Sequence, residues 1–495
     1  MNQISLADIK SKLLTKPVLA AVYFVVTSAG IFYLFRNWAY DDPFITYRYA
    51  LNIVKGFGFV YNPGERVMST TTPLFTLVLA ALSPLWSDLP RLANLIGAMS
   101  LALGALLLYW MADILKEPVV GWAGLLLFPT SPLLLNSLGS ETPLYITFCL
   151  ACFVFYLRSS YFLTAIFCAL AVLTRPDGIL VPLILAADYL IRVRRPIPWK
   201  PLFLFIALVL PWFIFSWLYF GSPVPATLAA KQHQGLMAIS QKFAAGFFTQ
   251  IKTFYQSWFY RIQAVAAVLG IISIILKSRR WLLFIAWLII YFITFIILGV
   301  TRYFWYYAPL IPGFVILVGI GLKQFALLIH RTLEKTLKSA HLANKLPQRV
   351  ALALLLILGI FQLVQLKEMA TNRDPRHLIY KTVGSWLQTN TLPDVSVGTL
   401  EVGIIGYYSQ RPIIDFAGLI QPETAFRLEH NTTYADAANY AVMRFRPNYL
   451  VLREGVFPDL EEVYAPQNCQ IAQRFLGSYY GYANDMVVYD CRASQ

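Results

Sequence analysis

The apolar stretch Pro73-Leu-Phe-Thr-Leu-Val-Leu-Ala-Ala-Leu-Ser-Pro-Leu-Trp86 decides how this chain is organised. It has about 14 residues and contains Pro84, whereas a transmembrane helix needs about 20 mostly apolar residues. Counting it as a crossing would invert the side of every loop that follows. We therefore interpret it as a segment that lies at the membrane interface.

The composition of the chain indicates a membrane protein. Of its 495 residues, 58% are hydrophobic and only 13% are charged, about half the charged share of soluble domains. This excludes a single water-soluble domain, and ordinary Gly and Pro contents exclude disorder and collagen-like repeats. The net charge of +15 would suit nucleic-acid binding in a soluble protein, but basic residues that flank lipid-buried helices are the commoner cause. We expect a polytopic membrane protein whose partner is the lipid bilayer and not a nucleic acid.

About eleven transmembrane helices are predicted from apolar runs of the required length. They fall near residues 17–36, 91–112, 119–137, 143–158, 160–174, 178–193, 201–220, 262–277, 281–299, 308–329 and 350–366. The first run is too long for a signal peptide and lacks a cleavage site with small residues, so we interpret it as a retained anchor.

Basic residues set the predicted orientation, because Lys and Arg accumulate in cytoplasmic loops. With residues 73–86 excluded as a crossing, the basic loops all fall on one side, which we interpret as the cytoplasm. These loops contain Lys10, Lys12, Lys16, Lys116, Arg158 and the stretches 192–195, 277–280 and 323–349. The N-terminus is then cytoplasmic, and residues 1–366 form a transmembrane domain whose first extracytoplasmic loop covers residues 37–90. Residues 367–495 lie on the extracytoplasmic side.

The region 367–495 has a different composition, with more polar residues and short apolar runs. The runs that begin at Val395, Pro412 and Tyr449 predict strands, and the segments between them can form helices, so we expect a small α/β domain. Cys469 and Cys491 lie in the compartment where disulfides persist, and they either pair or remain two small apolar side chains.

The densest polar cluster outside the cytoplasm is residues 38–72, which makes this loop the candidate site. Asp42 is a good helix N-cap with Pro43 at the first helical position, and Gly56 is a good stop. The helix between them places its apolar residues on one face, which suits a helix lying on the membrane. These residues are Phe44, Tyr47, Leu51 and Val54.

The two acidic residues of this loop differ in how well local structure explains them. Capping accounts for Asp42, whereas Asp41 precedes the cap and has a weaker structural explanation. Asp41 is either a solvated loop residue or a functional carboxylate.

This loop resembles that of the GT-C superfamily, multispanning glycosyltransferases that use polyprenyl-phosphate sugars. The resemblance rests on Asp41-Asp-Pro-Phe-Ile-Thr-Tyr-Arg-Tyr-Ala-Leu-Asn52 and on Gly56-Phe-Gly-Phe-Val-Tyr-Asn-Pro-Gly-Glu-Arg-Val67. It is strongest with the arabinofuranosyl- and mannosyltransferase-like members that carry an Asp-Asp pair. The sequence departs from the arabinofuranosyltransferase pattern at Met68-Ser-Thr-Thr-Thr-Pro73, so the resemblance does not identify the sugar.

Weaker matches extend over most of the chain. They are Gly139-Ser-Glu141, Thr174-Arg175-Pro-Asp177-Gly178, Tyr219-Phe-Gly-Ser-Pro-Val-Pro-Ala226 with Lys231, Arg302-Tyr303, and Val402-Gly-Ile-Ile-Gly-Tyr-Tyr408. The orientation predicted from charge places Asp41, Glu141, Arg175, Lys231 and Arg302 at the same membrane face.

The resemblance implies transfer of a sugar from a polyprenyl-phosphate donor to a hydroxyl group of a glycan, lipid or protein acceptor. A phosphate leaves readily as its anion, so one base suffices and the anomeric configuration inverts. We assign the base to Asp41, with Asp42 as the fallback. Glu141 either caps the following span or binds substrate hydroxyls, and Asp177 is predicted as the N-cap of the next span.

Cations in a partly dry cavity would stabilise the leaving phosphate. The candidates, in order, are Arg302, Lys231 and Arg175, and the alternative for each is a side chain that extends to the interface. The aromatic residues around Arg302 form either part of the site or an interfacial belt. Arg48, Tyr47 and Tyr303 are further substrate-binding candidates.

No cofactor or metal is predicted. The five His residues, at positions 233, 330, 341, 377 and 430, lack metal-ligand spacing, and no Gly-rich phosphate loop precedes a helix. Two alternatives to an enzyme are a transporter or flippase of lipid-linked sugars and a membrane sensor. The first is disfavoured because no pair of repeated halves is found, and the second leaves the acidic loop unexplained.

Overall fold

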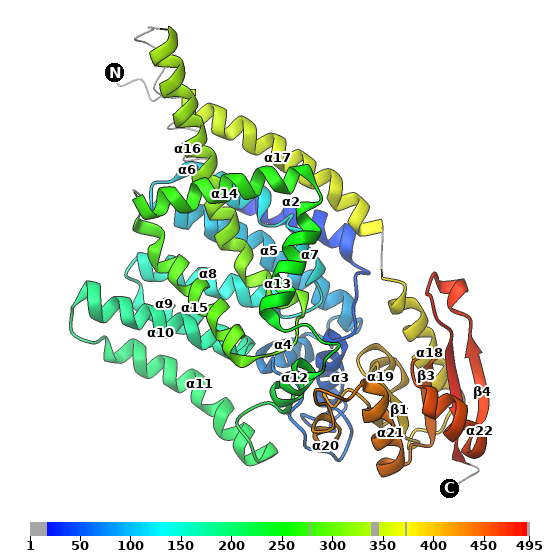
Figure 1. The fold of residues 1–495 in the computed structure, drawn as a ribbon. Coiled ribbons are helices and arrows are strands. Elements are labelled where there is room, and N and C mark those ends of the chain that lie inside the picture. Colours follow the sequence, from blue (N-terminus) through cyan, green and yellow to red (C-terminus); the bar gives the residue numbers. More distant parts are fainter. Residues whose placement is uncertain (1–16, 277–278, 338–345, 372–373, 493–495) are drawn as a thin grey trace.

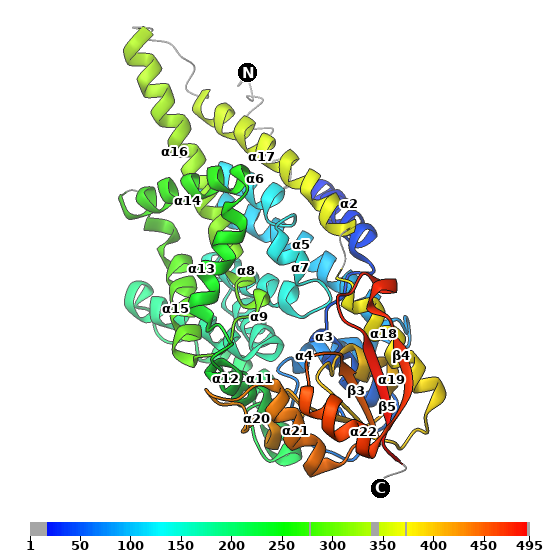
Figure 2. The same ribbon diagram turned by 45° about the vertical axis from the view of Figure 1, so that its right-hand side comes forward.

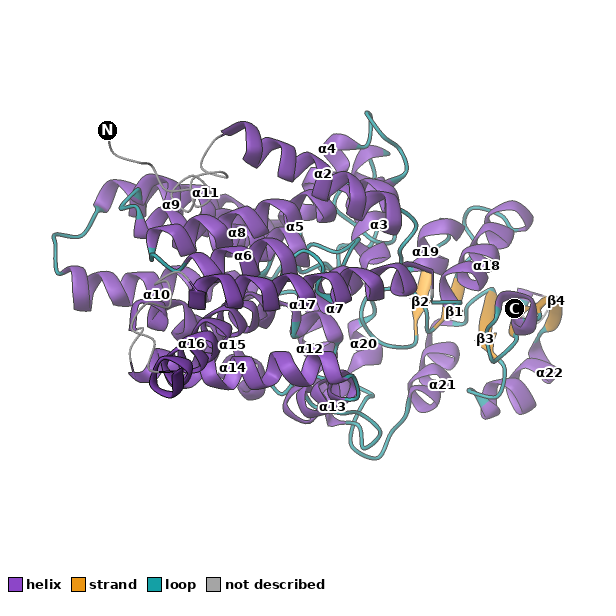
Figure 3. Cartoon of the chain, turned by 90° about the horizontal axis from the view of Figure 1, so that it is seen from above, coloured by secondary structure: helices purple, strands orange, loops and turns teal. Residues whose placement is uncertain are grey.

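The computed structural model describes residues 17–276, 279–337, 346–371 and 374–492. Most of it is a helical bundle, and a small sheet from the C-terminal part lies beyond one end of this bundle (Figures 1 and 3). The helices that overlap the predicted spans are α2 (Pro17–Phe35), α5 (Leu89–Ile114), α6 (Pro118–Leu127), α8 (Thr142–Leu157), α9 (Tyr161–Thr174), α10 (Leu180–Asp188), α11 (Trp199–Phe220), α14 (Trp258–Leu276), α15 (Leu282–Leu298), α16 (Ile311–Leu337) and α17 (Leu346–Thr371). Lys10, Lys12, Lys16, Lys277 and the stretch 338–345 lie outside the described residues.

Seven helices in the described part of the chain are long and apolar enough to cross a membrane, so the chain is a multi-pass membrane protein. Helices α6, α8 and α9 are shorter, with 10 to 17 residues. In α6 the reason is local, because Pro129 and Pro132 follow closely and the second begins a separate short helix, α7 (Pro132–Asn136). The number of eleven crossings therefore stays a prediction.

Helices α5 and α11 occupy opposite environments. In α5, 72% of the most apolar window is buried within the protein, and this helix packs against α2, α6 and α8. In α11 the corresponding value is 11%, and large apolar side chains such as Trp217 and Leu218 are exposed. An apolar helix with an exposed surface of this kind is suited to contact with lipid.

The helix predicted after Asp42 is α3 (Pro43–Val54), and its start and end agree with the prediction. The prediction that its apolar face lies on the membrane is wrong for Phe44 and Tyr47, which are each only 1% exposed, whereas Val54 at the end of the helix is exposed. Both rings contact Tyr407 from the C-terminal region. A local apolar pattern does not distinguish a face buried by lipid from one buried by a distant part of the same chain.

The apolar stretch 73–86, on which the predicted orientation depends, forms α4 (Pro73–Leu82), a helix of 10 residues. A transmembrane helix needs about 20 residues, so α4 is too short to cross the membrane. Its Phe75 and Leu79 are buried, and the helix packs mainly against α3 and α9.

The C-terminal part is a mixed sheet with helices, as its short apolar runs predict. The strands are β1 (Val397–Thr399), β2 (Ile413–Asp415), β3 (Tyr449–Arg453), β4 (Gln470–Phe475) and β5 (Met486–Asp490), in the order β2-β1-β3-β5-β4. Strands β2, β1 and β3 are parallel, and β5 pairs antiparallel with both β3 and β4. The three predicted strands are therefore confirmed. Cys469 and Cys491 form a disulfide next to β4 and β5, which resolves the open alternative.

The remaining helices complete both parts and bring them together. They are α12 (Ala226–Leu236), α13 (Phe243–Tyr255), α18 (Arg376–Asn390), α19 (Ile404–Ser409), α20 (Pro422–Ala425), α21 (Tyr434–Phe445) and α22 (Ala465–Asn468). Figure 2 shows α3, α4, α12 and α20 gathered at the end of the bundle that meets the sheet, far from the free end of α16.

Candidate active site

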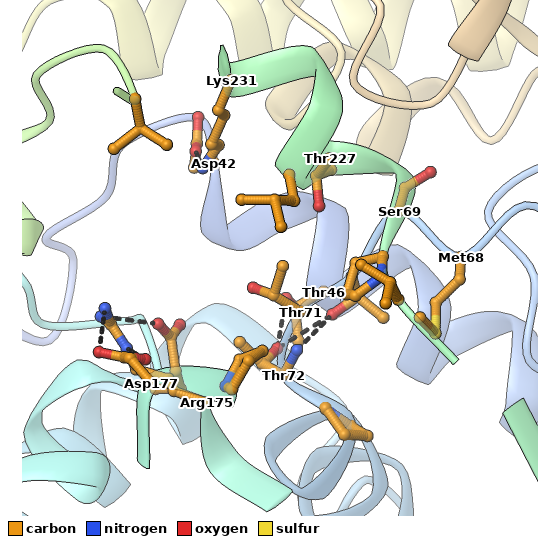
Figure 4. A pocket seen from close by; sticks show the side chains of 18 of the residues that line it. Asp42, Thr46, Met68, Ser69, Thr71, Thr72, Arg175, Asp177, Thr227 and Lys231 are labelled. Carbon is orange, nitrogen blue, oxygen red and sulfur yellow. Dashed lines mark hydrogen bonds and ion pairs between the residues drawn. The ribbon is translucent and has the colours of Figure 1, made fainter. Parts of the chain in front are cut away.

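A cavity of about 410 Å³ lies among α3, α9, α10, α12 and the loops that join them. Its polar lining residues are Tyr40, Asp42, Thr46, Ser69, Thr70, Thr71, Thr72, Ser140, Glu141, Arg175, Asp177, Thr227, Lys231, Thr294, Trp305 and Tyr306. Much of the remaining wall is apolar and includes Leu180, Trp212 and Phe295. Figure 4 shows the charged groups at one end of this cavity and the hydroxyl-bearing residues toward the other.

Asp42 and Lys231 form the first charged pair. Lys231 Nζ lies 3.3 Å from Asp42 Oδ2, and Figure 4 shows the two side chains beside each other above the cavity. The prediction that Asp42 caps α3 is wrong, because its side chain makes no cap hydrogen bond and its backbone is already helical. The carboxylate points instead to Lys231 of α12, which is 189 positions away in the sequence, so the residues around Asp42 do not indicate this contact.

Aromatic rings surround the Lys231 ammonium. It lies 4.8 Å from the Tyr303 ring centroid, 5.4 Å from that of Trp305 and 5.5 Å from that of Tyr306. Burial by itself would lower the pKa of Lys231, but Tyr306 and Asp42 raise it above its ordinary value. Lys231 therefore remains a cation, held by aromatic faces and one carboxylate.

Arg175 is the centre of the second charged group. Its Nε and Nη2 each donate to Asp177 at 3.0 Å, and its Nη1 lies 3.5 Å from Glu141. Its Nη1 also donates to Thr142 at 3.2 Å. The guanidinium is buried, so the alternative of a side chain that extends to the interface does not describe it.

The prediction that Asp177 caps the next span is also wrong, and Glu141 does not cap a helix through its side chain. The N-cap of α10 is Ile179, and Asp177 binds Arg175 instead. Glu141 occupies the N-cap position of α8, but its side chain makes no cap hydrogen bond. Burial raises the pKa of Glu141 even though Arg175 opposes the shift. Both carboxylates line the cavity, and neither makes a side-chain cap bond.

Asp41 is not among the residues that line the cavity. Its two carboxylate oxygens accept hydrogen bonds at 2.8 Å from the backbone N–H groups of Gly403 and Ile404. Residue 403 must be glycine here, since a Cβ would lie 1.9 Å from the Asp41 carbonyl oxygen. Burial and the nearby carboxylate of Glu401 raise the pKa of Asp41 to about 8.

Further residues of the first loop bind the same C-terminal segment. Arg48 donates to the carbonyl oxygens of Tyr61 at 3.0 Å, Arg411 at 2.7 Å, and Gly406. The Tyr61 hydroxyl donates to Val402 O, and Asn62 makes two backbone bonds with Ile413, each of 2.9 Å. We call the contacts of Asp41, Arg48, Tyr61 and Asn62 with residues 402–413 the interdomain contact.

The other predicted binding residues lie at varying distances from the cavity. Tyr47 is buried and donates to Gly139 O. Tyr303 stacks on Trp305 with ring centroids 4.4 Å apart and donates to Gln234 at 2.9 Å. Arg302, the first candidate for phosphate binding, is exposed, donates to Gln241 at 2.9 Å, and does not line the cavity.

Some residues that line the cavity were not predicted as site residues from the sequence. Thr46, Thr70 and Thr72 bond to one another through their hydroxyls, at 3.2 Å for Thr46 with Thr72 and 3.0 Å for Thr70 with Thr72. Tyr40 stacks on Trp305 with centroids 5.4 Å apart. The available hint was the departure at residues 68–73, where three consecutive threonines appear. Across the described residues, no group of three or more His, Cys, Asp or Glu side chains is placed to hold a metal ion.

The C-terminal part of the chain matches a known family. Residues 367–489 match a family described as a domain of unknown function (DUF8728). A search of curated proteins gave no match.

The chain is similar along almost its whole length to solved structures. ArnT from Cupriavidus metallidurans bound to undecaprenyl phosphate is 15% identical, covers 96% of this chain and 98% of its own, and has a TM-score of 0.56. The apo form of the same protein is also 15% identical, with coverages of 95% and 97% and a TM-score of 0.59. The archaeal oligosaccharyltransferase AglB from Archaeoglobus fulgidus, in complex with an inhibitory peptide and a dolichol-phosphate, is 14% identical. It covers 90% of this chain and 70% of its own, with a TM-score of 0.53.

Proposed function

Starting from the GT-C glycosyltransferase fold that the chain shares with these structures, we propose that it is an inverting glycosyltransferase. It transfers a pentosyl or hexosyl group from a polyprenyl-phosphate donor to a hydroxyl group of a cell-envelope glycan, a lipid or a protein. The presence of undecaprenyl phosphate in the ArnT structure and of a dolichol-phosphate in the AglB structure supports a lipid-linked donor.

The observation that carries the proposal is the make-up of one cavity. Asp42, Lys231 and Arg175 share it with an apolar wall that contains Leu180 and Phe295. A polyprenyl-phosphate sugar needs these three features together, since its tail is apolar, its phosphate is anionic, and its acceptor must lose a proton.

In the proposed reaction Asp42 is the general base, the fallback of the sequence analysis. The acceptor oxygen bonds to the anomeric carbon while its proton passes to Asp42. The bond between this carbon and the phosphate oxygen breaks, and the electron pair leaves with the phosphate. The phosphate needs no protonation to leave, so no second carboxylic acid is required. Asp41 takes no part in this chemistry because its carboxylate binds Gly403 and Ile404.

Lys231 couples donor binding to the base. Its ammonium is 3.3 Å from Asp42 in the ligand-free structure. A donor phosphate competes with Asp42 for this ammonium, so donor binding would free the Asp42 carboxylate to accept a hydrogen bond from the acceptor hydroxyl. Lys231 then stabilises the charge that grows on the leaving phosphate.

Arg175 and Glu141 are proposed to act together at the charged end. Arg175 gives one N–H from Nε and one from Nη2 to Asp177, and one from Nη1 to Thr142, so a phosphate oxygen can still accept the second N–H of Nη2 or that of Nη1. Glu141 lies 3.5 Å from Nη1 and would accept hydrogen bonds from substrate hydroxyls.

We place the protein in the plasma (inner) membrane with its N-terminus in the cytoplasm and the cavity at the extracytoplasmic face. The support is the distribution of basic loops in the sequence. Helices α3 and α12, which line the cavity, lie at the end of the bundle that meets the C-terminal sheet (Figure 2), so the cavity and the sheet would face the same compartment.

The direct test is transfer by the purified full chain in lipid nanodiscs. Polyprenyl-phosphate sugars are supplied with a panel of glycan, lipid and peptide acceptors, and new glycosidic bonds are detected by mass spectrometry. We expect a product of inverted configuration and no loss of transfer in chelator. A sugar that crosses the membrane of a vesicle without any new glycosidic bond would instead establish a transporter.

Lys231→Met tests the phosphate role separately. Binding of polyprenyl phosphate without a sugar should weaken about tenfold or more, since one charge-assisted contact is lost. Arg302→Met is the matched control, because Arg302 is outside the cavity lining. Equal weakening by both variants would contradict the assignment of Lys231.

A further inference from the structure

One wall of the cavity carries hydroxyl groups and no charge. We call it the hydroxyl wall, and it consists of Thr46, Thr70, Thr71, Thr72 and Thr227. These residues come from three separate segments, namely α3, the loop before α4, and α12. Their meeting at one cavity is therefore a product of the fold and not of a local repeat.

Hydrogen bonds hold part of this wall in place while leaving bonding capacity toward a ligand. Thr72 Oγ1 lies 3.2 Å from Thr46 Oγ1 and 3.0 Å from Thr70 Oγ1, and Thr72 N donates to Thr70 Oγ1 at 3.2 Å. A hydroxyl donates one hydrogen bond and accepts two, so a chain of three hydroxyls does not use all of its capacity.

Thr227 provides an independent sign of a missing partner. Its side chain is 4% exposed, and within the described residues its hydroxyl has no hydrogen-bond partner. Figure 4 shows this hydroxyl directed from α12 toward the space above Thr46 and Thr71. Buried hydroxyls are normally bonded, so an unpaired one directed into a cavity indicates a ligand that supplies the partner.

Charge is excluded from this wall. The five charged lining residues already form ion pairs with one another: Asp42 with Lys231, and Arg175 with Asp177 and Glu141. Figure 4 shows the four labelled charged residues, Asp42, Lys231, Arg175 and Asp177, apart from Ser69, Thr71 and Thr72. An ammonium or carboxylate group of a ligand placed at the hydroxyl wall would be desolvated without a counter-ion, which is strongly unfavourable.

We propose that the hydroxyl wall binds the sugar ring of the donor and selects an uncharged pentose or hexose over an amino sugar or a uronic acid. This inference rests on the proposed function. Thr46 is four residues after Asp42, one turn along α3 and on the same side of the helix. A ring on the wall therefore has its anomeric carbon close to Asp42 and its phosphate close to Lys231.

The test measures binding before catalysis. The full chain in nanodiscs is titrated by native mass spectrometry with polyprenyl phosphate alone and with polyprenyl phosphates that carry a neutral hexose, a neutral pentose, an amino sugar or a uronic acid. We expect at least one neutral donor to bind at least about tenfold more tightly than the bare phosphate, while both charged donors bind no better than it. Tighter binding of a charged donor, or equal binding of all of them, would overturn the inference.

Variants then locate the effect. Thr227→Val and Thr71→Val should remove the advantage of the neutral donor without changing binding of the bare phosphate. Thr294→Val is the matched control, because Thr294 lines the same cavity outside the hydroxyl wall. If the control removes the advantage as fully as Thr227→Val, the hydroxyl wall is not the sugar site. If neutral donors bind as expected but no acceptor is ever glycosylated, the proposed function fails while the sugar site remains.

Discussion

Two adjacent carboxylates, Asp41 and Asp42, belong to two different regions of the molecule. Asp41 faces the C-terminal part and accepts hydrogen bonds from Gly403 and Ile404, whereas Asp42 faces the cavity and pairs with Lys231. The first is a contact between distant segments and the second is a candidate catalytic group. Two neighbouring residues of one motif can thus have different roles, one in packing and the other as a candidate catalytic group. The motif alone does not show which residue has which role.

The largest expected effect is on the rate of sugar transfer, and it distinguishes the role of Asp42 from that of Asp41. Asp42→Asn should lower kcat of sugar transfer by about 10²–10⁴-fold, because a general base contributes a factor of this size. Thermal unfolding should change little, since its ion pair with Lys231 is partly exposed. Asp394→Asn, at an exposed position in the C-terminal part, is the control. If Asp41→Asn abolishes transfer in a stably folded protein while Asp42→Asn does not, the two roles are reversed.

A second effect concerns the interdomain contact. Arg48→Met should destabilise the protein by about 3 kcal/mol or more, because it removes three hydrogen bonds from a charged donor, each worth about 1.5–3 kcal/mol. The measurement is thermal unfolding together with limited proteolysis that releases the C-terminal part. Arg302→Met, at an exposed arginine, should be neutral. Loss of donor binding without loss of stability would instead place Arg48 at the substrate.

Gly403→Ala should have a smaller effect at the same contact. A Cβ there would lie 1.9 Å from the carbonyl oxygen of Asp41, so the two parts must move apart. Overpacking of this kind costs about 1–3 kcal/mol. Gly455→Ala is a control with open space around its Cβ, although its positive φ makes some backbone strain expected there as well. An unchanged unfolding temperature for Gly403→Ala would show that the contact is looser than described.

The last expected effect is a dependence on pH. Burial and Glu401 raise the pKa of Asp41 from its ordinary value of 3.8 to about 8. Between these values the folded protein keeps a proton that the unfolded chain has released, so the contribution of Asp41 to stability falls as the pH rises. Unfolding temperatures measured from pH 5 to pH 8 should decline, and Asp41→Asn should flatten this decline. A slope that is the same in both proteins would show that Asp41 titrates near its ordinary pKa.

The sequence analysis predicted those features that depend on short segments. The bounds of α3 follow from Pro43 and Gly56, and three strands of the C-terminal sheet follow from short apolar runs. The capping roles of Asp42 and Asp177 were wrong for the same physical reason. A cap is the best local explanation of an acidic residue before a helix, but Lys231 and Arg175 offer stronger partners that only the fold brings near.

The candidate site was predicted in part. Lys231, Arg175 and Glu141 do line one cavity together with Asp42. Arg48 and Tyr47 belong instead to the packing beneath the C-terminal part, because their partners lie in segments far along the chain. The hydroxyl wall could not be predicted from the sequence, because threonine is common in loops. Its hydroxyl groups indicate a binding surface only once the fold brings three separate segments together.

The bond between Asp41 and Gly403 joins residues that are 362 positions apart. During synthesis the first loop is made early, and its partner follows only after the bundle helices have been inserted. The cavity therefore acquires its final geometry late, when the last quarter of the chain folds against the first loop, which was synthesised much earlier. Before residues 403 and 404 are made, the chain has the charged groups of the site but not the contact that holds the loop carrying Asp42.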